Sequence, residues 1–155
     1  MLRWLDRLVE TLLGVVLAVL VLVGVGQVLG RLLFSNPLAW ALEASIVLLV
    51  WATMLAGYVG VRRNSHLSAD FAGIAFSART RWRLELAGLL LCVGFTLTYG
   101  WVSFRVIDAM DGIPFAALPV GQPVLYWSLP VSAALMVVAF VQRLRAHWAL
   151  RPTGV

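Results

Sequence analysis

The stretch WALEASIVLLVWATMLAGYVGVRRNSHLSAD, residues 40–70, determines how the rest of the sequence is interpreted. It contains an uncharged run, residues 44–61, between Glu43 and the pair Arg62 and Arg63. As an α-helix rising about 1.5 Å per residue, such a run spans about 27 Å, which is most of the hydrocarbon core of a bilayer. A carboxylate at one end and two guanidinium groups at the other give this predicted transmembrane helix a direction.

The composition of the whole chain also indicates a membrane protein. Of 155 residues, 62% are hydrophobic and 12% are charged, whereas a soluble domain carries about 25% charged residues. Long apolar runs recur along the chain and predict four transmembrane helices, over residues 8–34, 41–61, 79–104 and 124–143. The predicted fold class is therefore an all-α membrane protein, with residues 1–155 forming a single four-span domain.

Two connecting segments have patterns of their own. Residues 62–85 contain apolar side chains near helical spacing, namely Leu67, Phe71, Ile74 and Ala78. This predicts a short amphipathic helix on the membrane surface between the second and third spans. The prolines of residues 114–123 make a regular helix unfavourable there. Pro130 is expected either to kink the fourth span or to lie in its first turns.

Arginine and tryptophan predict the orientation. With four spans both termini share one side, and every arginine except Arg31 and Arg105 then faces that side. The positive-inside rule places that side, and both termini, in the cytoplasm. Tryptophans fall near both predicted interfaces, as amphipathic indoles should. Because the arginines separate apolar runs instead of forming one stripe, we expect contact with the lipid bilayer and not with nucleic acid.

The predicted spans carry few groups that could do chemistry. No ionisable side chain lies near the middle of a span, where a proton-coupled carrier needs one. His66 and His147 fall outside the spans, and Cys92 has no second cysteine to pair with. Phosphate-binding loops, metal-ligand spacings and catalytic triads are not recognisable. We therefore expect no catalytic residue, no cofactor and no metal.

Small residues instead favour contacts with other helices. Gly26 and Gly30 form a GxxxG motif, and another small-residue face is formed by Ala52, Ala56 and Gly60. Glu43 has two interpretations, a charge favoured by the helix dipole at an N-terminus or a charged contact to a partner subunit. These features predict an accessory membrane subunit.

Several motifs resemble those of the DctQ-type small membrane subunit of tripartite ATP-independent periplasmic (TRAP) transporters. Trp40-Ala-Leu-Glu43, Trp51, Gly57 and Arg62-Arg63-Asn-Ser-His66-Leu67-Ser-Ala-Asp70 are similar to that family's second span and the loop after it. Tyr126-Trp-Ser-Leu-Pro130 is similar to the start of its last helix. Two positions depart from the family pattern: Ala44 replaces a frequent second acidic residue, and Ser65 replaces a common glycine.

The resemblance implies a subunit that braces the large multi-span membrane subunit of a secondary transporter. Such a system takes up a carboxylate solute, delivered by a periplasmic solute-binding protein, and is driven by an ion gradient, usually of sodium. The residues expected to contact the partner subunit or anchor the chain are Trp40, Glu43, Trp51, Arg62, Arg63 and His66. Arg105, Asp108 and Asp111 are charged and fall on the predicted outer face, so they are solvated loop charges or help to dock the binding protein.

Two alternatives from other classes remain at this stage. One is a small four-span membrane enzyme acting on lipophilic substrates, which should have polar residues clustered inside its helices. The other is a self-sufficient dimeric small exporter, which should have a carboxylate in the middle of a span. The sequence favours a protein that is not an enzyme.

Overall fold

The computed structural model describes residues 3–34, 39–63 and 78–149. Its helices are α1 (Arg3–Phe34), α2 (Ala39–Arg62), α3 (Ala78–Ala109), α4 (Pro123–Tyr126) and α5 (Ser128–Ala149). Four helical segments are long and apolar enough to cross a membrane: Trp4–Leu33, Ala39–Arg62, Trp82–Ala109 and Pro123–Trp148. The predicted all-α fold with four transmembrane helices is thus confirmed. The predicted surface helix falls largely on residues 64–77, which lie outside the described part of the chain.

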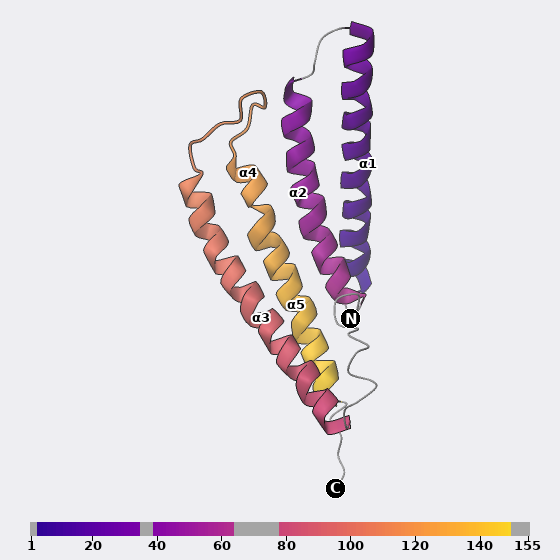
Figure 1. The fold of residues 1–155 in the computed structure, drawn as a ribbon, viewed down its shortest axis with the longest axis vertical. Helices are drawn as coiled ribbons and strands as arrows, with labels where there is room; N and C mark the ends of the chain where they lie inside the picture. The colour runs from indigo at the N-terminus through magenta and orange to yellow at the C-terminus, as the bar shows by residue number, and fades with distance from the viewer. Residues whose placement is uncertain (1–2, 35–38, 64–77, 150–155) are drawn as a thin grey trace.

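The four long helices lie side by side in the order α1, α2, α5, α3 (Figure 1). α5 follows α3 in the chain but lies between α3 and α2. The α1–α2 hairpin and the α3–α5 hairpin therefore contact each other through α2 and α5. A row of this kind leaves two broad faces without a second layer of helices. The most apolar part of α1 contains no buried residue, and on α3 the side chains of Leu91 and Phe95 are 75% and 72% exposed.

The buried core lies where α1, α2, α3 and α5 approach one another most closely. It consists of Val9, Leu55, Tyr58, Val61, Leu89, Ala139 and Phe140. Glycines allow the close helix contacts around α5. A Cβ atom added to Gly57 would lie 2.3 Å from Cε of Met136, and one added to Gly100 would lie 3.0 Å from Cβ of Ala133.

The small-residue faces predicted from sequence are only partly used inside the chain. Ala52 is buried, but Ala56 is exposed. A Cβ atom on Gly26 would have no neighbour within 4 Å, so no described helix of this chain approaches it closely. Of the two glycines of the GxxxG motif, Gly26 is therefore open toward the described helices, and Gly30 is half-buried.

The fourth span contains α4 and α5. α4 is a single turn that starts at Pro123, and α5 begins at Ser128. Trp127 between them keeps α-helical angles, with φ −61° and ψ −21°, so the helix continues through this point as one span, Pro123–Trp148. Pro130 lies in the first turn of α5, so the second of the two predicted placements is correct. The segment before α4 is irregular, as its prolines predict, and contains one isolated bridge between Pro114 and Gly121.

Candidate partner-binding site

A polar cluster at one end of the row joins three helices. Arg62 of α2 donates from Nε to Oδ1 of Asp6 on α1 at 2.7 Å and from Nη2 to its Oδ2. Its Nη1 donates to Oε1 of Gln142 on α5 at 2.7 Å. The hydroxyl of Tyr58, one turn before Arg62, donates to Oδ1 of Asp6 at 2.6 Å. We call these four residues the Arg62 cluster; it fixes α1 and α5 on either side of α2.

Two further arginine contacts lie beside the Arg62 cluster: an exposed ion pair between Arg63 and Glu10, and a partly buried hydrogen bond from Arg143 to Val61. Arg63 donates to Oε1 of Glu10 at 3.2 Å from Nε and at 2.8 Å from Nη2, with side-chain exposures of 65% and 41%. Arg143 of α5 reaches the carbonyl oxygen of Val61 at 3.3 Å. The second contact adds another link between α2 and α5, whereas the exposed pair is screened by water and contributes little.

The same end of the row also joins α3 to α5. The indole of Trp82 stacks on the ring of His147, with centroids 5.1 Å apart, and Nε1 of Trp82 donates to the His147 carbonyl at 3.3 Å. The Nε2 atom of His147 lies 3.1 Å from the Trp82 carbonyl. His147, which the sequence places outside the spans, therefore helps to close the α3–α5 hairpin.

At the opposite end, Glu43 holds the segment that joins α3 to α4. Its Oε1 accepts the amide of Ala116 at 2.9 Å, and its Oε2 accepts the amides of Ala117 and Leu118 at 2.9 and 2.8 Å. We call this arrangement the Glu43 clasp. Neither sequence interpretation of Glu43 included a bond to this segment.

Trp51 makes a second link near the same end. Its Nε1 donates to the carbonyl of Val124 in α4 at 3.1 Å, so α2 is bonded both to the segment before α4 and to α4 itself. Trp40 is 43% exposed. Glu43 and Trp51 are thus used within the chain, while the indole of Trp40 is available to lipid or a partner.

The remaining predicted site residues are distributed unevenly. Arg105, Asp108 and Asp111 are all exposed near the end of α3. His66 lies outside the described residues. Nothing in the sequence marks Asp6 or Gln142. Tyr58 and Arg62 are one helical turn apart, which puts both on one face of α2 and could have indicated a shared acceptor.

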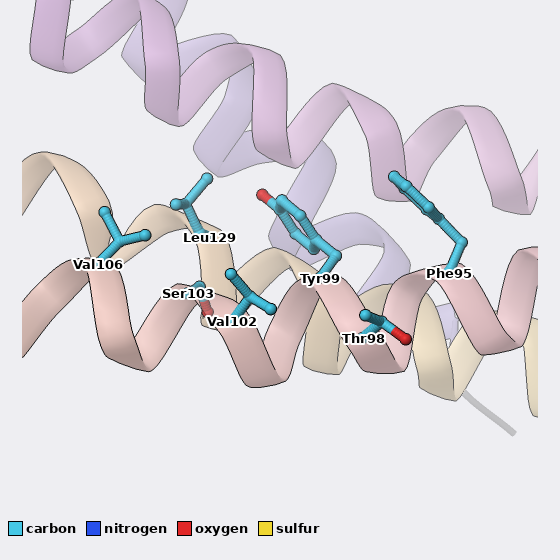
Figure 2. A pocket seen from close by; sticks show the side chains of 7 residues that line it. All are labelled: Phe95, Thr98, Tyr99, Val102, Ser103, Val106 and Leu129. Atoms are coloured by element: carbon cyan, nitrogen blue, oxygen red, sulfur yellow. The ribbon is translucent and has the colours of Figure 1, made fainter.

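An apolar groove follows α5 between α2 and α3. It has a volume of about 700 Å³ and is lined mainly by carbon atoms. Its hydroxyl groups are bonded within the chain: Thr96 donates to the Cys92 carbonyl at 2.7 Å, and Tyr99 donates to the sulfur of Met54 at 3.0 Å. A smaller hollow of about 310 Å³ lies beside it, between α3 and Leu129 (Figure 2). Neither hollow presents a free polar group that could orient a solute.

The described residues therefore define a multi-pass membrane protein whose polar side chains tie its own helices together and whose apolar faces are open. Over residues 20–150 the sequence matches the family of tripartite ATP-independent periplasmic transporters, DctQ component. The chain belongs to this family, and the predicted resemblance is confirmed.

Two relatives support the assignment. The chain is 28% identical to the sialic acid TRAP transporter permease protein SiaT of Haemophilus influenzae, over 90% of this chain and 23% of that protein. It is 23% identical to the C4-dicarboxylate TRAP transporter small permease protein DctQ of Vibrio cholerae, over 88% of this chain and 69% of that protein. The chain thus spans less than a quarter of SiaT but about two thirds of the small permease protein.

Proposed function

We propose that this chain braces the large membrane subunit of a TRAP transporter that takes up a carboxylate solute with a sodium gradient. The observation that carries the proposal is the single row of helices, open on both apolar faces. Polar bonds join all four long helices at the Arg62 end, and at the other end they join α2 to α4 and to the segment before it. Such bonds form a frame, and the groove and the hollow beside α5 are lined by described residues that are mainly apolar. The open faces of the row favour a protein neighbour in the bilayer, where close helix packing is a main source of association.

The relatives support a separate large subunit. Only 23% of the length of SiaT is matched by this chain, so most of that permease protein has no counterpart here. We infer that the solute and ion sites lie in a large multi-span membrane subunit outside the residues of this sequence, because one relative is named a small permease protein. A periplasmic solute-binding protein completes the three-part system that the family name describes.

The orientation in the bacterial inner membrane belongs to the same proposal. With both termini in the cytoplasm, the Arg62 cluster faces the cytoplasm and the Glu43 clasp faces the periplasm. The exposed arginines Arg7, Arg83 and Arg145 support this orientation, because they fall on the side that the positive-inside rule assigns to the cytoplasm.

The nature of the solute is inferred from the relatives. One relative is named for sialic acid and the other for C4-dicarboxylates, and both kinds of solute carry a carboxylate. We propose the same chemical class for this transporter. The choice among carboxylates then belongs to the partner proteins, because the groove along α5 and the hollow beside it are mainly apolar.

Reconstitution tests the proposal. The full chain should copurify with the large subunit in detergent, and the pair in vesicles should take up solute only with the binding protein and an inward sodium gradient. The chain alone should move nothing. Transport or substrate conversion by the isolated chain would contradict the proposal and favour the dimeric exporter or the membrane enzyme.

A further inference from the structure

The segment between α3 and α4, residues 110–122, has a defined shape of its own. The amide of Phe115 donates to the Val120 carbonyl at 3.2 Å, and the amide of Gln122 donates to the Ile113 carbonyl at 2.9 Å. Gly112 has a φ of 76°, which an ordinary side chain disfavours, and its amide donates to Oδ1 of Asp111 at 3.1 Å. We call this segment the α3–α4 loop.

Glu43 holds the middle of this loop against α2. The three amides that it accepts belong to successive residues, 116–118, and both oxygens of the carboxylate are used. An exposed loop would otherwise sample many conformations. The clasp therefore serves to keep the loop in one conformation. Both carboxylate oxygens of Glu43 are used for bonds within the chain.

The loop displays a mixed apolar and acidic surface. Ile113 and Val120 are each 41% exposed. Asp111 in the loop and Asp108 in the last turn of α3 are also exposed, and Arg105, one turn before Asp108, adds one positive charge to these two negative ones. Apolar side chains bordered by charges, on a backbone that is already ordered, are suited to binding another protein because little conformational freedom is lost on association.

We propose that the α3–α4 loop is the surface on which the periplasmic solute-binding protein docks, and that Glu43 is the positioning residue that holds the loop in its docking shape. The inference rests on the function and orientation proposed above. A soluble partner that must bind, deliver its solute and leave is served by a preformed surface, because ordering a mobile loop at each encounter would weaken binding.

Lipid headgroups are the competing occupant, since exposed apolar residues can also lie in a membrane interface. The carboxylates of Asp108 and Asp111 oppose this, because they are repelled by anionic headgroups and carry their hydration with them. The surface of a soluble protein can instead provide positive groups that pair with them.

Crosslinking from the loop tests the occupant directly. The experiment uses the full chain in complex with its large subunit in lipid nanodiscs, with a photoreactive amino acid at Val120 and purified solute-loaded binding protein. We expect a crosslink between this position and the binding protein, and none when the same group replaces Arg145 at the other end of α5. Crosslinks from Val120 to lipid alone would overturn the proposal.

Glu43→Gln tests the positioning residue. The substitution keeps the size of the side chain but puts an NH₂ group against backbone amides that also donate. We expect faster hydrogen exchange at residues 116–118 and about tenfold weaker affinity for the binding protein, the effect of losing one charge-assisted hydrogen bond. The large subunit should still copurify with the variant.

Glu10→Gln is the matched control, because it makes the same change in an exposed carboxylate at the opposite end of the molecule. It should leave the affinity for the binding protein unchanged. If Glu43→Gln frees the loop amides and the affinity stays at the wild-type value, the inference is wrong. If instead the wild-type chain fails to copurify with the large subunit, the proposed function itself fails. The Val120 crosslink is made with Glu43 intact, so it still decides the occupant if Glu43→Gln does not fold.

Discussion

Arg62 and Arg63 follow each other in the sequence but lie in different surroundings. The Arg62 side chain is 26% exposed and its partner Asp6 is 23% exposed, whereas Arg63 is 65% exposed beside Glu10. Water screens the second pair far more than the first. Arg62 also bonds Gln142, so one side chain connects α1, α2 and α5.

Replacing each arginine in turn should separate these effects. Arg62→Ala should lower the free energy of unfolding by about 2 kcal/mol, because Asp6 would keep its charge with only Tyr58 as a described side-chain donor. Arg63→Ala should lower it by less than about 1 kcal/mol. Detergent-titrated unfolding followed by circular dichroism measures both. Equal losses from the two variants would show that burial of the Asp6 pair contributes nothing.

Trp51 provides a second prediction for a single residue. Trp51→Phe keeps an aromatic ring but removes the donor to the Val124 carbonyl, so it should cost about 1 kcal/mol. Amide exchange should also become faster across residues 123–131, where α4 meets α5. Trp101→Phe is the control, because Trp101 is 71% exposed on α3. Identical exchange in both variants would show that the indole bond does not hold the α4–α5 junction.

Glu43 shows why sequence reasoning stops short of the candidate site. A carboxylate before an apolar run is easily recognised, and the sequence supplied two sensible interpretations. Its observed partners, residues 116–118, are more than seventy positions away and donate through backbone amides. Backbone donors carry no residue-type signal, so no motif could have indicated the clasp.

At the level of elements, the sequence predicts much more. Apolar runs predict transmembrane helices because a helix satisfies its own backbone hydrogen bonds in lipid. The prolines of residues 114–123 predict the irregular segment before α4, because proline lacks the backbone N–H that a helix needs. Contacts between helices are harder to predict: Gly100 meets Ala133 of α5, whereas a Cβ atom on Gly94 of the same helix would meet nothing within 4 Å.

These two glycines allow a matched test of helix packing. Gly100→Leu should push α3 away from α5 and lower stability by roughly 1–3 kcal/mol, as overpacking does. Gly94→Leu adds the same side chain to the same helix on an exposed side, and its effect should be small. Unfolding in detergent and the yield of folded protein measure the difference. A Gly94→Leu variant as unstable as Gly100→Leu would show that loss of glycine, and not the contact with Ala133, is responsible.

At the scale of the whole molecule, the order of the helices in the row could not be predicted. Every span is apolar on most of its circumference, so hydrophobicity does not say which helix lies next to which. The order α1, α2, α5, α3 depends on particular polar pairs, such as Arg62 with Gln142 and Trp82 with His147. Each pair joins positions more than sixty residues apart.

The same pairs predict how the molecule behaves during transport. The Arg62 cluster joins α1, α2 and α5 at one end of the row, and Trp82 with His147 joins α5 to α3 there, so α1 and α3 should keep a constant separation while the large subunit moves. Spin labels at Leu32 and Trp101, which are 73% and 71% exposed, should give the same distance distribution within about 1 Å in sodium-free and sodium-loaded complexes. Uptake by the labelled complex confirms that it is still active. A shift of several ångströms in an active complex would mean that this chain changes shape during the transport cycle. The proposal that it braces the large subunit would then be wrong.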